Sequence, residues 1–224
     1  MIKCVVFDFD GTLVDSNQIK RHTFFEIVRP WDPSDEIVAE VFQRCPAANR
    51  YEKTREIAKG LITRKLLPGE PSLESWSIRL ADDYTAKCEA AIACCRERPG
   101  ATAALEILFK TGLQLFVNSA TPVVPLQRLT QLRNWDHYFQ AVYGAEATKA
   151  ENLQNIARVS GAVCTEMVHV GDQLDDQNGA KQFGCHFVAM TAGIAESPVR
   201  KNPLSIEDLR DLPALLDEIS REAS

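Results

Sequence analysis

The chain lacks any stretch of about 18 uninterrupted apolar residues, the length that a transmembrane helix needs. Its first ten residues, MIKCVVFDFD, also lack the apolar run and small-residue cleavage site of a secretory signal peptide. Positive charge is scarce, because 25 Lys and Arg stand against 31 Asp and Glu, for a net charge of −6. We therefore expect a cytoplasmic protein without general affinity for nucleic acid or for anionic membranes.

Paired cysteine motifs are absent as well. The chain has seven cysteines but no CxxC pair, so we expect neither a zinc site nor a disulfide framework. Reduced thiols that serve as small apolar groups are the expected state. No Ser-His-Asp arrangement is evident, and His169, which lies inside a predicted strand, is expected to be a core residue with its polar atoms satisfied.

What the chain does contain is a regular alternation of short apolar runs and helical patterns. The runs, rich in β-branched residues, predict buried strands at 2–8, 112–119, 140–144, 166–172 and 185–191. Helical patterns lie between them at 104–110, 151–161 and 175–184, and the last two end on a glycine. This alternation predicts an α/β fold, a doubly wound parallel sheet covered by helices on both faces. Such sheets bind ligands at the carboxyl ends of their strands.

One interval breaks this spacing. More than a hundred residues separate Asp10 from the strand that ends near Ser119, whereas later strands follow one another at βαβ distances. Apolar residues recur at helical spacing within 37–42, 57–62 and 73–84. We therefore predict a helical insertion at about 16–95 and an α/β core made of residues 1–15 and 96–224.

Polar side chains gather where the predicted strands end. Asp8 and Asp10, two residues apart, point to the same side of a strand, so their ionised forms need a cation or a shared proton between them. Carboxylates with open water positions suit Mg²⁺, and a lysine and a hydroxyl at the same point suit phosphoryl oxygens. The other strands supply Asn118, Ser119, Lys149, Asp172, Asp175 and Asp176.

These segments resemble a known family. FDFDGTLVDS at 7–16 resembles the first signature, DxDGT(L/V)xDS, of the haloacid dehalogenase superfamily of phosphohydrolases. FVNS at 116–119, Lys149 and VGDQLDD at 170–176 resemble its second, third and fourth signatures, in the correct order. The resemblance implies a Rossmann-like core with a helical cap inserted after the first signature, as in phosphoglycolate phosphatase and phosphoglucomutase-like members. Two positions depart from the pattern: Ala150 follows Lys149 where proline is frequent, and Gln173 follows Asp172 where a small hydroxyl residue is common.

The resemblance also implies residue roles. Asp8 would attack phosphorus to form an aspartyl-phosphate, and Asp10 would protonate the leaving group and then activate water. Mg²⁺ would be held by the side chains of Asp8 and Asp172 and by the backbone carbonyl of Asp10. The remaining implied residues contact the phosphoryl oxygens (Ser119, Lys149), orient water or the lysine (Asp176), or bind substrate (Asn118, Ala120).

The predicted cap would choose the leaving group. Residues 44–50 are expected to form a loop between cap helices, and Arg44 and Arg50 could meet a second anionic group of the substrate. The alternative is that both are ordinary surface arginines.

Together these features favour a Mg²⁺-dependent phosphatase for a small phosphorylated metabolite, such as phosphoglycolate, a sugar phosphate or a nucleotide, acting as a monomer or homodimer. A phosphomutase with the same Asp8 chemistry is the main alternative. A phospho-receiver domain or a binding module without turnover is a weaker one, because receivers are about half this length and carry no helical insert. A dehalogenase is disfavoured, because that chemistry does not need Asp10.

Overall fold

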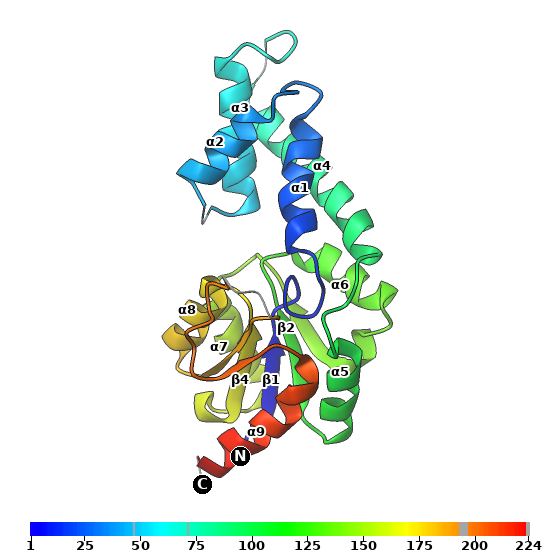
Figure 1. Ribbon diagram of the computed structural model, residues 1–224, viewed down its shortest axis with the longest axis vertical. Helices are drawn as coiled ribbons and strands as arrows, with labels where there is room; N and C mark the ends of the chain where they lie inside the picture. The colour runs from blue at the N-terminus through cyan, green and yellow to red at the C-terminus, as the bar shows by residue number, and fades with distance from the viewer. Residues whose placement is uncertain (47, 71, 193–196, 223–224) are drawn as a thin grey trace. The chain divides into compact units, whose positions relative to one another are not determined.

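The sheet of the core has six parallel strands. This computed structural model describes residues 1–46, 48–70, 72–192 and 197–222. The strands lie in the order β3-β2-β1-β4-β5-β6 (Figure 1). Strand β1 is therefore central: β2 and β3 lie on one side of it, and β4, β5 and β6 on the other. The doubly wound α/β fold predicted from the sequence is thus confirmed. The strand bounds are Cys4–Phe7 (β1), Gln114–Asn118 (β2), Phe139–Tyr143 (β3), Met167–Gly171 (β4), His186–Met190 (β5) and Ser205–Ile206 (β6).

Helices cover both faces of this sheet. Right-handed crossovers put the helices before β2 and β3 on one face and those before β4 and β5 on the other. Accordingly α7 packs against α8, whereas α5 packs against α9 (Figure 1). Their bounds are Ala101–Lys110 (α5), Val123–Leu132 (α6), Lys149–Ser160 (α7), Leu174–Phe183 (α8) and Leu212–Glu222 (α9), with short 3₁₀ turns at Asp136–Tyr138, Cys164–Glu166 and Leu209–Asp211.

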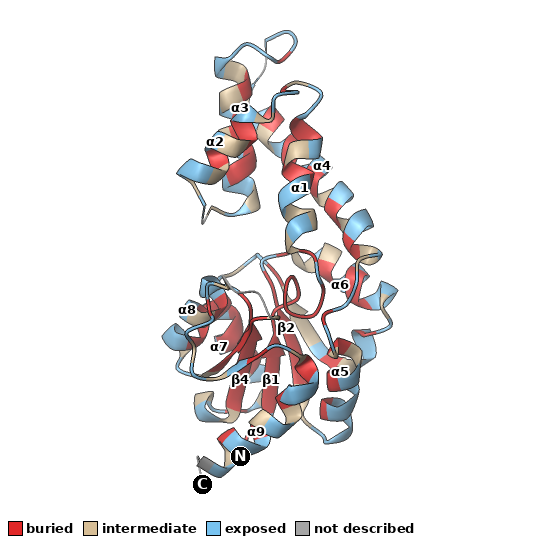
Figure 2. Cartoon of the chain, in the orientation of Figure 1, coloured by how far each residue is buried: buried red, intermediate tan, exposed pale blue. Residues whose placement is uncertain are grey.

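Sequence periodicity decides which side chains of β1 meet which helices. Cys4 and Val6 pack in one buried cluster with Leu153 and Ile156 of α7. Because side chains alternate along a strand, Asp8, the next even position, is expected on the same face, toward α7 and α8. The four inner strands β2, β1, β4 and β5 are buried along most of their length, whereas the edge strands β3 and β6 are more exposed (Figure 2).

The chain divides into two compact units, Met1–Ser16 with Cys95–Ser224, and Asn17–Cys94. The second unit consists of helices. Asn49 accepts hydrogen bonds from the first turn of the third helix, and Ser72 does so for the fourth, which fixes where each begins. The helices are Asn17–Val28 (α1), Glu36–Arg44 (α2), Arg50–Thr63 (α3) and Leu73–Ala93 (α4).

The structure also shows where sequence patterns were silent. The first helix α1, the two-residue edge strand β6 and the last helix α9 were not predicted. Strand β6 carries too few residues for any periodicity. Within the described ranges, no helix is both long and apolar enough to cross a membrane.

Candidate functional site

Four loops at the carboxyl ends of the strands bring the predicted polar residues together. Asp8 follows β1, Ser119 follows β2 and Asp172 follows β4. Lys149 is the first residue of α7. Its place there is set by Thr148, whose hydroxyl accepts from the backbone N–H of Glu151 while the Glu151 carboxylate accepts from the backbone N–H of Thr148. Because this capping box determines where α7 begins, it also determines which side chain points back over the sheet edge.

The centre of the site is a buried lysine between two acids. The Nζ of Lys149 lies 2.7 Å from Oδ1 of Asp8 and 2.8 Å from Oδ1 of Asp176. It also donates to the backbone carbonyl of Asn118 at 2.5 Å. All three side chains are at least nine-tenths buried, so their attraction is weakly screened by solvent. A substrate anion entering here would meet a cation already fixed in position.

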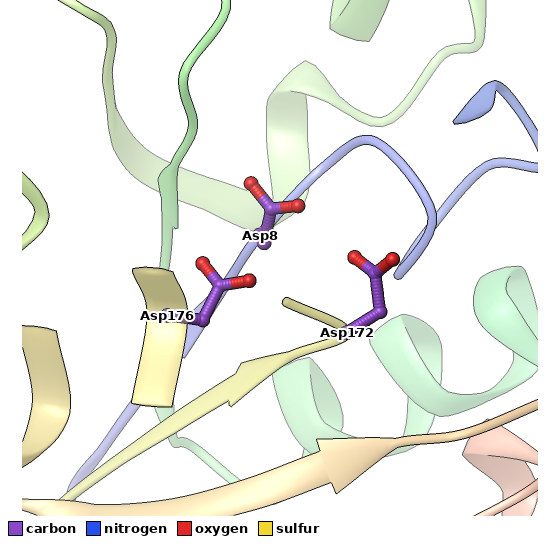
Figure 3. Close-up of side chains that lie close together, drawn as sticks. All are labelled: Asp8, Asp172 and Asp176. Atoms are coloured by element: carbon purple, nitrogen blue, oxygen red, sulfur yellow. The ribbon is translucent and has the colours of Figure 1, made fainter. Parts of the chain in front are cut away.

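Three carboxylates at this point could hold a metal ion. One oxygen each from Asp8, Asp172 and Asp176 lies within 4.8 Å of the others. The three side chains come from the residue after β1, the residue after β4 and the first turn of α8, and they point to the same side (Figure 3). Carboxylate oxygens are the ligands of hard divalent cations. Asp172 is oriented by the Thr12 hydroxyl at 3.3 Å and the Gln173 amide at 2.5 Å. The donor set therefore fits a hard cation.

The electrostatics of the cluster depend on this crowding. Burial raises the pKa of Asp8 well above its ordinary value; Lys149 opposes the rise, while Asp176, Asp172 and Asp10 add to it. Burial also acts to raise the pKa of Asp176, but Lys149 and His169 outweigh it and hold that pKa below its usual range. For Lys149, burial is outweighed by Asp176 and Asp8, which raise the pKa of its ammonium group. Lys149 therefore stays charged, whereas ionisation of Asp8 is disfavoured in the folded protein.

Asp10 lies among hydroxyl groups instead of beside the lysine. The hydroxyl of Ser16 donates to its Oδ1 at 2.6 Å, and that of Thr121 donates to its Oδ2 at 2.7 Å. Ser119 is farther, with Oγ at 3.4 Å from Oδ2. The two acids that a two-residue spacing puts side by side thus have distinct partners. Neither Ser16 nor Thr121 was predicted to contact Asp10. The sequence shows only that both are hydroxyl residues, Ser16 inside the first signature segment and Thr121 just after the second.

The side chain of Asn118 turns into the protein. It is fully buried, donates to the backbone carbonyl of Lys149 at 3.0 Å and accepts from Asn152 at 3.0 Å. These bonds tie the end of β2 to the start of α7. The neighbouring Ala120 is exposed at the strand end. The Asn118 side chain is thus hydrogen-bonded within the protein, and its role in substrate binding stays a prediction.

Arg98 contacts the turn that follows Asp10, a contact that the sequence did not predict. Its Nε donates to the carbonyl of Gly11 at 2.9 Å, and its Nη2 lies 3.3 Å from Oδ1 of Asp15. Gly11 has φ 86°, a left-handed conformation that glycine adopts without strain. Arg98, which follows the helical unit in the sequence, thus stabilises the turn that precedes this unit.

Two arginines of the helical unit were predicted to bind substrate, and both have partners within that unit. Arg44 forms an ion pair with Glu56 at 2.8 Å. Arg50 donates to the Thr85 hydroxyl at 3.3 Å, and its guanidinium lies 5.4 Å from the centre of the Tyr84 ring. Their loop is tied down by the ammonium of Lys53, which donates to the carbonyls of Pro46 and Ala48. Ala47 of the predicted loop lies outside the described residues.

The sequence of this chain matches one protein-family model. Residues 2–184 match the model described as haloacid dehalogenase-like hydrolase. A search of curated proteins found no match.

Solved structures share the fold at low sequence identity. A predicted phosphoglycolate phosphatase from Haemophilus somnus 129PT is 18% identical over 96% of this chain and 97% of its own, with a TM-score of 0.74. CbbY from Rhodobacter sphaeroides, solved in complex with phosphate, is 19% identical over 97% and 100%, with a TM-score of 0.71. A 2-haloacid dehalogenase from Pseudomonas syringae pv. tomato is 22% identical over 97% and 99%, with a TM-score of 0.66. These likenesses extend over nearly the whole of each chain, helical unit included.

Proposed function

Because this chain belongs to the haloacid dehalogenase-like hydrolases, we propose that it is a Mg²⁺-dependent phosphatase that hydrolyses a small phosphorylated metabolite. The observation that carries the proposal is the placement of Lys149, which joins Asp8 to Asp176 next to Asp172 at the carboxyl end of the sheet. The residues proposed as nucleophile (Asp8), as cation for the phosphoryl oxygens (Lys149) and as metal ligand (Asp172) thus lie close together and are buried.

The proposed nucleophile is Asp8. Its carboxylate oxygen attacks phosphorus, the bond from phosphorus to the ester oxygen breaks, and an aspartyl-phosphate results. Asp10 gives its proton to the leaving alkoxide and then accepts one from the water that hydrolyses the intermediate. The hydroxyls of Ser16 and Thr121 hold the Asp10 carboxyl in place for both transfers. Separate partners for Asp8 and Asp10 suit these separate tasks.

Lys149 and Ser119 are proposed to bind the phosphoryl oxygens, together with backbone N–H groups of the loop that contains Ala120. Asp176 keeps Lys149 directed at Asp8. Mg²⁺ would be held by the carboxylates of Asp8 and Asp172 and by the Asp10 carbonyl, and when bound it neutralises negative charge at the reacting centre. The net charge of −6 disfavours nucleic acid and anionic membrane surfaces as partners, and the fixed cation Lys149 suits a small phosphorylated metabolite. We propose a cytoplasmic monomer or homodimer.

Exchange of Asp8 for Asn tests the nucleophile. Asp8→Asn is expected to lower turnover of an aryl phosphate at least about a thousandfold, because an amide oxygen is a poor nucleophile. The measurement is phosphate release with and without Mg²⁺, by wild type, Asp8→Asn and Asp175→Asn. Asp175 is a matched control, since it is an exposed acid on α8 near the same site. Near wild-type turnover in Asp8→Asn would show that the nucleophile lies elsewhere.

A phosphomutase remains the alternative, since the same Asp8 chemistry can return the phosphoryl group to a sugar. The two are separated by product analysis: isomerisation of a sugar phosphate primed by a bisphosphate marks the mutase, and release of free phosphate marks the phosphatase. A receiver domain would instead give a long-lived aspartyl-phosphate without sustained phosphate release. The helical unit Asn17–Cys94, which receivers do not carry, favours the hydrolase.

We propose that the helical unit sets substrate choice through Arg44 and Arg50. Replacing either by Ala is expected to lower turnover of a substrate with a second anionic group about tenfold more than turnover of a plain aryl phosphate. Arg64→Ala is the matched control, because Arg64 lies in the same unit and pairs with Glu36 and Glu40. Equal losses on both substrates would count against this role.

A further inference from the structure

A histidine lies fully buried beneath the proposed site. His169 is the third residue of β4, where its partner on β1 is Val6. Met167, two residues earlier on the strand, packs in the cluster formed with α7, so His169 faces the same helical layer. Apolar residues flank it at Val168 and Val170, so an aliphatic side chain would suit this strand position.

The ring of His169 contacts the acid that holds the lysine. Its Nε2 lies 3.3 Å from Oδ1 of Asp176, the same oxygen that lies 2.8 Å from the ammonium of Lys149. Lys149 in turn lies 2.7 Å from Asp8. A chain of contacts thus joins His169 of β4 to the proposed nucleophile Asp8, through Asp176 of α8 and Lys149 of α7.

The direction of the hydrogen bond follows from the other partners of Asp176. Its Oδ1 faces the ammonium of Lys149 and its Oδ2 accepts from the backbone N–H of Gln173, so both oxygens act as acceptors. The ring nitrogen Nε2 lies 3.3 Å from Oδ1, and a hydrogen bond between the two requires the proton on Nε2. His169 therefore donates to Asp176.

A second observation shows how Asp176 is held in place. A Cβ at Gly171 would lie 2.3 Å from the Cβ of Asp176, so this acid is packed directly against the end of β4. Its other oxygen accepts the backbone N–H of Gln173 at 3.1 Å. With His169 on Oδ1 and Gln173 on Oδ2, both oxygens are held from the protein side, and Oδ1 stays directed at Lys149.

We propose that His169 is a positioning residue for the reaction. By donating to Asp176, it fixes the carboxylate that pairs with Lys149. The fixed carboxylate in turn keeps the ammonium of Lys149 beside Asp8. This inference rests on the proposed function and adds a residue from the interior of β4 to it. Ring packing alone would be a different role, in which shape matters and the Nε2–H does not.

Two near-isosteric variants separate the roles. His169→Gln keeps an N–H donor at the same number of bonds from the backbone, whereas His169→Met has similar length and no donor. The measurements are kcat and KM on an aryl phosphate with saturating Mg²⁺, together with the midpoint of thermal unfolding for each variant. We expect kcat of His169→Met to fall about tenfold or more, with little change in KM, and His169→Gln to stay within about threefold of wild type.

Equal kcat in the two variants, or losses of kcat that follow the loss of thermal stability in both, would overturn the inference. Should either variant fail to fold, the ring of His169 is observed directly by ¹⁵N NMR of the wild-type protein. A ring proton on Nε2 supports the inference, and a proton only on Nδ1 overturns it. The proposed function fails separately, through absence of phosphoester turnover in the wild type, and the NMR result still decides whether His169 donates to Asp176.

Discussion

At the scale of single residues, Asp8 and Asp10 differ more than their shared residue type suggests. Asp8 is next to a lysine and two acids, whereas Asp10 accepts from hydroxyl groups of Ser16 and Thr121. Hydroxyls that donate to a carboxyl group orient it without adding charge. Thr121 thus belongs with Asp10, although it lies 111 positions away in the sequence.

Thr121 offers a direct test of this arrangement. Thr121→Val keeps the shape but removes the donor at 2.7 Å, and is expected to lower kcat about tenfold, since a hydrogen bond to a charged group contributes roughly 1.5–3 kcal/mol. Thr121→Ser restores the hydroxyl and is expected to recover most of the activity. The check is steady-state kinetics on an aryl phosphate. Equal activities for the Val and Ser variants would contradict the role.

At the scale of elements, the site depends on how closely α7 and α8 approach. Gly179 of α8 faces the start of α7, and a Cβ there would lie 2.6 Å from the Cβ of Lys149. Lys149 and Asp176 reach their 2.8 Å contact from these two helices. A glycine in mid-helix costs about 1 kcal/mol of helix stability relative to alanine, and here it allows the ion pair to form.

Gly179→Ala is therefore expected to destabilise the protein by about 1–3 kcal/mol, despite the better helix propensity of alanine, because the two helices must move apart. Activity should fall as well, since Lys149 would shift from Asp8. Urea unfolding and phosphate release measure the two effects. Asn178→Ala, at an exposed position of the same helix, is the control and should leave stability within about 0.5 kcal/mol. Unchanged stability and activity in Gly179→Ala would argue against a close helix contact.

At the scale of the whole molecule, the ionised form of Asp8 opposes folding. Burial and the neighbouring acids raise the pKa of Asp8, although Lys149 opposes this. An acid whose pKa is higher in the folded state than its unfolded value of about 3.9 favours folding at low pH, and that contribution is lost as pH rises toward the folded pKa. A bound cation would offset the cost.

Metal removal should make this cost visible. In EDTA at neutral pH, Asp8→Asn is expected to be more stable than wild type by about 1 kcal/mol, with the difference growing as pH rises from about 4. Added Mg²⁺ at a hundredfold its Kd should stabilise wild type by about 2.7 kcal/mol and the variant by less. Thermal unfolding by circular dichroism across pH, with EDTA or Mg²⁺, is the measurement. A wild type more stable than the variant in EDTA at all pH values would contradict the expectation.

The sequence by itself determined the α/β class, the haloacid dehalogenase-like family and the approximate positions of five strands along the chain, because these depend on local periodicity and on short contiguous signatures. It also named Asp8 and Asp172, which directly follow strands, and Lys149 and Asp176, which lie in the first turn of the helices after β3 and β4. The catalytic roles of these residues stay predictions until the variants are measured.

Only the tertiary structure decided which oxygen meets which donor. The pairing of Thr121 with Asp10, the bracing of Gly11 by Arg98 and the contact of His169 with Asp176 join elements through side chains. Such contacts leave no periodic signal, since a hydroxyl, an arginine or a strand histidine occurs equally well at positions without a partner. They arise when parallel strands and their helices converge at one edge of the sheet, and that convergence is a property of the packed molecule.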